Sequence, residues 1–157
     1  MSEKDFRDVY LGGSCGDSKW REIAIPLLRK HGISYINPYI TGYNQRLIPI
    51  QVAARERCRI LLYVITGRTR SLSSMIEAGY YIGLGCKVIL CIQQIPEHAV
   101  IGGEQITECG LKDYSRGRSY LADLANREGV HIFEDVAESV MYCVKCLKDI
   151  PLDTGYS

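Results

Sequence analysis

The sequence lacks a strong net charge, a long apolar run and an apolar N-terminal segment. Its 157 residues carry 19 Lys and Arg against 18 Asp and Glu, so we expect neither a nucleic-acid polymer nor a membrane surface as a partner. The longest apolar runs, near 60–65 and 88–92, are the length of strands and too short to cross a bilayer. The charged N-terminus has no signal-peptide core. We therefore expect a cytoplasmic protein, with the nucleus as the alternative compartment.

Patterns typical of metal sites and disulfide frameworks are also missing. The three histidines are scattered, and the seven cysteines form an odd number, which favours reduced thiols in a protein without a secretion signal. Cys143 and Cys146 form a C-x-x-C pair, but no second pair lies at ligand spacing, so helix packing is the preferred interpretation. We predict no metal and no cofactor.

Short apolar runs alternate with helical patterns along the chain, which is typical of a doubly wound α/β/α sandwich. We expect a single domain over 1–150 with a loose tail at 151–157. The predicted strands of a five-stranded parallel sheet are 8–12, 33–36, 59–65, 87–92 and 130–133. The predicted helices are 19–31, 50–57, one that holds Glu77 and stops near 83–85, one from 114 or 115 to 127, and 137–148; 40–48 and 93–114 are expected to be loops.

Three segments follow predicted strands at the edge where such folds bind ligands. The first is Gly12, Gly13, Ser14 and Cys15, where glycines let a ligand approach the backbone and a helix N-terminus offers free N–H groups. It matches neither the G-x-G-x-x-G fingerprint nor a Walker A loop, and a tight turn with no ligand is the alternative. Asn37, the second, stands where a dinucleotide site would need an acid.

The third segment, 66–74, offers five hydroxyls and two arginines without an acid. Arg70, Ser71 and Ser73 belong to it. Hydroxyl and guanidinium donors before a helix N-terminus suit a phosphate or a sugar. A solvated loop with a capping serine is the competing interpretation.

Glu77 is the only charged residue between Arg70 and Lys87. A lone carboxylate in a largely buried helix is costly unless it is satisfied or functional. Ser74 and Glu77 also fit a capping box, provided that the helix starts at Ser74; a start at Ser71 would exclude that. On a helix, the residues three and four positions before and after Glu77 would lie beside it. None of them is basic: Ser73, Ser74, Tyr80 and Tyr81.

Tyr10 lies late in the first predicted strand, two residues before the glycines. Its hydroxyl could reach a carboxylate on the helix that follows the third strand. An ordinary core tyrosine is the alternative, and from this residue alone it is the preferred one.

Together, these segments resemble the nucleoside 2-deoxyribosyltransferase-like superfamily, which includes nucleoside 5′-monophosphate N-glycosidases. The matching pieces, in consistent order, are 9–14, Trp20 and Arg21, Asn37 and Pro38, 58–66, 71–83 and 113–121. The resemblance implies a flavodoxin-like fold, a homodimer or higher oligomer, and cleavage of the N-glycosidic bond of a nucleoside or nucleotide. It implies that Glu77 is the nucleophile, oriented by Tyr10, and that 12–15 and the start of the Glu77 helix hold the sugar and its 5′ end.

The sequence departs from the transferase pattern at Arg59 and Ser71. Transferases carry an aspartate at each position, whereas the family's monophosphate glycosidases have a serine at the second. A hydroxyl can donate to a phosphate that an aspartate would repel, so Ser71, with Arg68 or Arg70 nearby, favours a monophosphate and hydrolysis over base exchange. With an arginine at position 59, no residue is assigned as the general acid that would protonate the departing base.

Two other function classes compete with this interpretation. A non-catalytic nucleotide-binding or regulatory module is motivated by Arg59 and the missing acid. An FMN carrier is suggested only by the expected fold. A glutamate-dependent NAD glycohydrolase is a neighbouring enzyme hypothesis.

Overall fold

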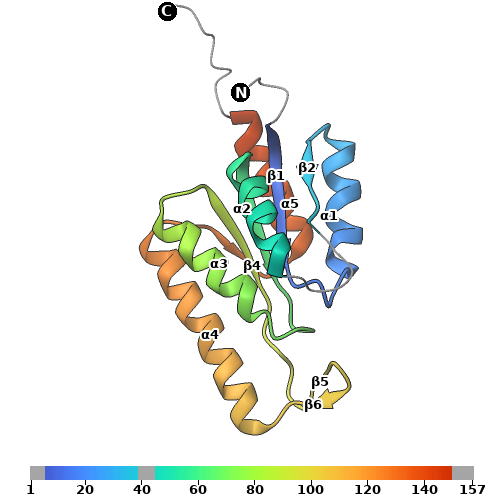
Figure 1. The fold of residues 1–157 in the computed structure, drawn as a ribbon, viewed down its shortest axis with the longest axis vertical. Helices are drawn as coiled ribbons and strands as arrows, with labels where there is room; N and C mark the ends of the chain where they lie inside the picture. The colour runs from blue at the N-terminus through green and yellow to red at the C-terminus, as the bar shows by residue number, and fades with distance from the viewer. Residues whose placement is uncertain (1–5, 39–44, 150–157) are drawn as a thin grey trace, which may run out of the picture.

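A computed structural model describes residues 6–38 and 45–149 of the chain. Five parallel strands form one sheet in the order β2–β1–β3–β4–β7 (Figure 1). Their bounds are β1 Arg7–Gly13, β2 Tyr35–Ile36, β3 Cys58–Ile65, β4 Val88–Ile92 and β7 Ile132–Phe133. The strand order reverses between β1 and β3, and crevices at such switch points are where α/β sheets bind ligands.

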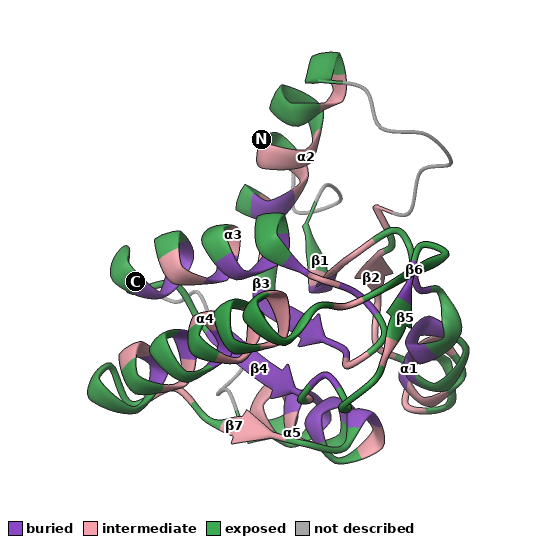
Figure 2. Cartoon of the chain, turned by 90° about the horizontal axis from the view of Figure 1, so that it is seen from below, coloured by how far each residue is buried: buried purple, intermediate pink, exposed green. Residues whose placement is uncertain are grey.

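Helices cover both faces of the sheet and confirm the predicted three-layer α/β/α fold. On one face α1 (Lys19–Lys30) and α5 (Val136–Asp149) pack over a core that includes Leu11 and Val64. On the other face α3 (Leu72–Gly83) and α4 (Glu108–Arg127) pack over Tyr63 and Leu90. The strands alternate between the two cores, and the central β3 and β4 are buried almost throughout (Figure 2). Apolar residues at every position of these strands follow from burial on both faces.

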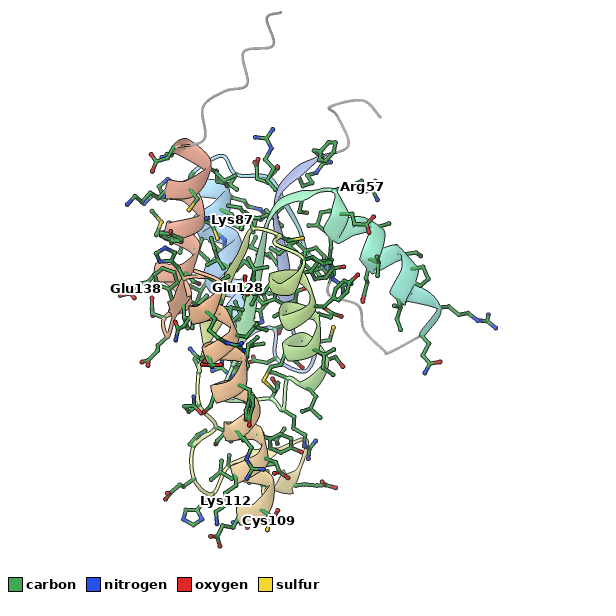
Figure 3. All side chains as sticks on the ribbon, turned by 90° about the vertical axis from the view of Figure 1, so that its left-hand side faces the viewer. Arg57, Lys87, Cys109, Lys112, Glu128 and Glu138 are labelled. Atoms are coloured by element: carbon green, nitrogen blue, oxygen red, sulfur yellow. The ribbon has the colours of Figure 1, made fainter. Side chains whose placement is uncertain are left out.

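The helix α2 (Ile48–Glu56) is the least buried element near the switch point. It follows a short 3₁₀ turn, Gln45–Leu47, and stands away from the sandwich in Figures 2 and 3. Within α2 only Arg55 is buried. Besides Arg55, the half-buried Ala54 packs against the core under α3 and α4, so α2 meets the body of the protein through an arginine and one small apolar residue.

The predicted loop over 93–114 is wrong in its second half. It contains an antiparallel hairpin, β5 (Val100–Ile101) and β6 (Glu104–Gln105), turned by two glycines in the left-handed conformation, Gly102 and Gly103. The helix α4 begins at Glu108, not at 114 or 115, because Thr107 caps it: its Oγ1 accepts from the Gly110 N–H at 3.0 Å. A capping threonine can start a helix even where a glycine stands in its first turn.

Two sequence predictions fall on parts of the chain that the structure does not describe. Most of the loop at 40–48 and all of the tail at 151–157 lie outside the described residues. Across the described ranges no helix is long and apolar enough to span a membrane. The same ranges hold no cluster of metal-ligating side chains, and both Cys143 and Cys146 are free thiols.

Candidate functional site

A cavity of about 470 Å³ opens at the switch point, between the end of β1, the helix α2 and the start of α3. Its size is that of a small-molecule site. Its walls come from four parts of the chain: Tyr10 and 12–15 from β1 and its loop, Pro38 after β2, Ile48, Gln51 and Arg55 from α2, and 70–74, Ile76 and Glu77 from the start of α3.

The structure brings together all but one of the predicted site residues. Tyr10, Gly12, Gly13, Ser14, Cys15, Arg70, Ser71, Ser73 and Glu77 line this cavity. Asn37 is not among the lining residues, and its neighbour Pro38 is. β2 is a two-residue edge strand that ends at Ile36, as predicted, so the residue that reaches the cavity is the second after the strand rather than the first.

Glu77 is not a capping residue. The helix α3 begins at Leu72, and Ser71 precedes it in a left-handed conformation with φ of 59°. Glu77 therefore lies six positions after the N-cap, and Ser74 lies inside the helix. With the capping box excluded, the carboxylate needs another partner.

That partner is Arg55, which comes from α2 and was missed at the sequence level. Its Nη2 lies 2.7 Å from Glu77 Oε1, with the Arg55 side chain 4% exposed and that of Glu77 33% exposed. The Arg55 guanidinium also lies over the Tyr10 ring, 5.3 Å from its centroid. No local spacing could reveal a pair separated by 22 residues; only the packing of α2 against α3 creates it.

Tyr63 provides the second contact to the carboxylate. Its hydroxyl donates to Glu77 Oε2 at 3.4 Å, and its ring lies 6.4 Å from that of Tyr10. The sequence placed Tyr63 only within an apolar strand. Gly12 leaves room for the Tyr63 ring, because a Cβ at this position would lie 2.5 Å from the ring. Gly12 is therefore required by packing, whatever the ligand.

Burial shifts the pKa of each acidic group around Glu77. Desolvation raises the pKa of Glu77, and the Arg55 guanidinium opposes that shift. Desolvation raises the pKa of Tyr10 to about 12 and that of Tyr63 further. Both phenols thus stay protonated near neutral pH, which leaves the Tyr63 hydroxyl able to donate to the carboxylate.

Arg70, rather than Arg68, reaches the cavity. Arg68 is held by Asp17, with Nε 2.7 Å from Oδ2, and does not line the cavity. Arg70 lines it and makes a longer contact, 3.4 Å, to Glu104 of β6. Beside Arg70, the first N–H groups of α3 at residues 72–74 have no acceptor within the helix, so this end of the cavity carries donors and positive potential.

A buried arginine of α4 holds the loop before α3 in place. Arg118 is fully buried and donates to the carbonyls of Thr66 at 2.8 Å and Thr69 at 3.0 Å, and to that of Gln93 at 2.8 Å. Ser71 is also held, with its Oγ 2.7 Å from Thr69 Oγ1. These contacts give the donor loop a defined conformation before any ligand binds.

Arg59 lies away from this cavity. It is exposed near the start of β3 and lines a different cavity with residues of α5. Among the described residues that line the Glu77 cavity, Glu77 is the only carboxylate. A second acid is not found where a transferase would need one.

A family model and solved structures are similar to this chain. The model of the family described as nucleoside 2-deoxyribosyltransferase like matches residues 7–95. A conserved protein from Enterococcus faecalis V583 is similar in structure, with a TM-score of 0.57 and 12% identity over 90% of this chain and 99% of that one.

A 2-desoxiribosyltransferase from Leishmania mexicana has a TM-score of 0.55 and 14% identity over 88% of this chain and 97% of that one. Both solved structures support the fold. No curated protein matches the sequence. Since the family match covers more than half of the chain, the protein belongs to the nucleoside 2-deoxyribosyltransferase-like family.

Proposed function

We propose that this protein hydrolyses the N-glycosidic bond of a nucleoside 5′-monophosphate with Glu77 as the nucleophile. The family supports glycosyl transfer broadly. The observation that carries the proposal is a carboxylate at a cavity wall, held by Arg55 at 2.7 Å and by Tyr63 at 3.4 Å. Two contacts fix the orientation of the carboxylate, as an attack on a sugar carbon requires.

The reaction uses the more loosely held oxygen of Glu77, Oε2. It attacks C1′ as the C1′–N bond breaks through an oxocarbenium-like transition state, and the bond's electron pair leaves with the base. The base takes a proton from solvent. Water then attacks C1′ of the glycosyl ester, releases the Glu77 carboxylate and gives up a proton. With one carboxylate among the described lining residues, hydrolysis is favoured over base exchange.

Arg70 and the N-terminus of α3 are the proposed 5′-phosphate site. Removing the guanidinium with Arg70→Gln should raise KM for a nucleoside monophosphate about tenfold or more, because a hydrogen bond between charged groups is lost. KM for the unphosphorylated nucleoside should hardly change. Steady-state kinetics on both substrates measure this. Arg116→Gln, which removes an exposed arginine on α4, is the control, and an equal effect on both substrates would reject the phosphate site.

Nucleotide binding without turnover is the second candidate function. The absence of a second carboxylate from the described cavity wall favours it. Incubation with deoxynucleosides, ribonucleosides, their monophosphates and NAD, followed by chromatography for free base, separates the two candidates. Tight binding without base release over hours supports the second and removes the first.

We also propose that the protein is a homodimer formed through α3. Four large apolar side chains repeat every fourth residue on its outer face, at 52%, 73%, 61% and 59% exposure: Leu72, Ile76, Tyr80 and Leu84. This set, the α3 stripe, carries no charge, so it is complementary to a second copy of itself across a two-fold axis. Leu72 and Ile76 also line the cavity, and a second copy would close its open side. Residues 1–150 act as one domain in each copy.

Placing a charge in the α3 stripe should separate the copies. Tyr80→Asp puts an unpaired carboxylate in an apolar interface and should shift the protein from dimer to monomer at micromolar concentration. Sedimentation velocity measures the change. Ile23→Asp, at an exposed apolar residue of α1 on the opposite layer, should leave the dimer intact. A wild-type protein that sediments as a monomer at 100 µM contradicts the dimer.

A further inference from the structure

A second cavity, of about 650 Å³, lies at the opposite end of the sheet from Glu77. It is formed by residues near the starts of β3 and β4 and by the last two turns of α5. Its lining holds three cations, Arg59, Lys87 and Lys145, and one acid, Asp149. The whole chain carries a net charge of only +1, so this concentration of positive charge is local.

Two of the three cations are held near each other by the sheet, and Lys145 of α5 lines the same cavity. Leu61 of β3 pairs with Val88 of β4, and the Leu61 N–H donates to the Lys87 carbonyl at 2.9 Å. Arg59 and Lys87 therefore lie on neighbouring strands within about two residues of the same register. The same register places Lys87 opposite Ile60, one residue from Arg59, and an anion bound between the two cations would offset their mutual repulsion.

Within the described ranges 6–38 and 45–149, no acid lies within 4.0 Å of the charged groups of Arg59, Lys87 or Lys145. Asp149 likewise forms no ion pair with a described residue. Elsewhere on the protein other exposed cations do form ion pairs, as Lys112 does with Glu108. The charge at this cavity is therefore uncompensated among described residues.

The rest of the lining is suited to a bound molecule rather than to water alone. Tyr142 and Ile60 supply apolar surface. The Tyr142 ring also packs against His131 and Phe133, at centroid distances of 4.5 and 5.3 Å. A fixed ring beside several cations is a common arrangement for phosphorylated small molecules, since the cations pair with phosphate and the ring packs against the remainder.

We infer that this basic cavity, lined by Arg59, Lys87 and Lys145, binds a small polyanion of the phosphate class, at a site separate from the Glu77 cavity. Binding at this cavity is separate from the proposed hydrolysis at Glu77 and does not depend on it. The ligand carries at least two negative charges, because three cations face one acid. A free diphosphate and the diphosphate of a nucleotide share this chemistry.

Isothermal titration of the full-length protein with inorganic pyrophosphate tests the site. We expect saturable binding that weakens as salt is raised. Arg59→Gln, Lys87→Gln and Lys145→Gln should each reduce the affinity about fivefold, the effect of removing one ion pair near the surface. ADP that binds more tightly than pyrophosphate identifies a nucleotide as the source, and equal affinities identify the phosphate groups alone; both support the site.

Two controls separate this site from the rest of the surface and from the proposed active site. Lys112→Gln removes an exposed lysine of α4 (Figure 3) and should leave pyrophosphate binding unchanged. Because Arg70 belongs to the proposed 5′-phosphate site, the three substitutions are also measured in the Arg70→Gln background, where saturable binding should persist and each substitution should still lower the affinity. Absence of saturable binding in that background, or an equal loss with Lys112→Gln, would overturn the inference. So would an oligonucleotide that binds this surface when pyrophosphate does not.

Discussion

Glu77→Gln is expected to lower kcat for base release at least about a thousandfold while the fold is retained. The amide has nearly the shape of the carboxylate but cannot attack C1′, so a step that depends on a covalent ester is lost. KM should change little, because the amide oxygen still fills the cavity wall. Steady-state release of base from a nucleoside monophosphate, with thermal unfolding measured alongside, gives both quantities.

The amide leaves Arg55 with an acceptor, which makes this variant more informative than an alanine. Glu77 Oε1 is the acceptor of the 2.7 Å contact, and the glutamine oxygen can take its place. Glu128→Gln is the matched control, since Glu128 is exposed at the end of α4 and Figure 3 shows it away from α2. Base release that survives Glu77→Gln contradicts the nucleophile.

Arg55→Met should produce the second largest effect, through the pKa of Glu77. The guanidinium is the main group that lowers this pKa against the effect of burial. Methionine keeps apolar bulk but removes the charge, so the pKa of Glu77 rises further and less carboxylate is present at neutral pH. We expect a loss in kcat/KM of about tenfold or more at pH 7. The low-pH side of the pH–rate profile, its acid limb, should move to higher pH.

The direction of the pH effect follows from which state binds the proton. Activity requires the ionised carboxylate, so it is lost as the pH falls through the folded pKa of Glu77, which lies above the usual value of 4.5. The stability of Arg55→Met shows the opposite trend. Because the folded state then binds the proton more tightly than the unfolded chain, its free energy of unfolding falls as the pH rises between the two pKa values.

Arg55→Met should also lower the free energy of unfolding by about 2 kcal/mol at neutral pH. Removing one partner of a buried pair costs more than this, but Glu77 is one-third exposed and solvent screens the remaining charge. Arg55→Lys, which keeps the charge, should restore most of the acid limb. The control is Arg57→Met, at the end of the same helix, where the guanidinium donates to the Ala53 carbonyl; it should leave the pH profile unchanged. An acid limb that stays in place in Arg55→Met would show that Arg55 does not control the pKa of Glu77.

The local patterns of the sequence predicted most of the sheet and most of the cavity. Parallel strands buried on both faces appear as continuous apolar runs, and the segments that follow them must meet at one edge. For this reason the positions of Gly12, Ser71 and Glu77 along the chain are enough to predict that they lie together. The end of the second strand at Ile36 was predicted, but which of the residues after it reaches the cavity, Pro38 rather than Asn37, is not encoded in the local pattern.

The partners of Glu77 could not be predicted in the same way. Arg55 is the one fully buried residue of its helix, and its pairing with Glu77 depends on where α2 packs. Tyr63 is indistinguishable from its apolar neighbours in β3 until the register of the strand shows which face it occupies. Both depend on tertiary packing, which spacing along the chain does not encode.

The most direct test of the account is intact-protein and peptide mass spectrometry of the wild type, quenched in acid during turnover of a nucleoside 5′-monophosphate. We expect a mass increase equal to one sugar phosphate less one water, located on the peptide that contains Glu77 and absent from Glu77→Gln. Turnover with no adduct on that peptide, together with undiminished base release by Glu77→Gln, would contradict it.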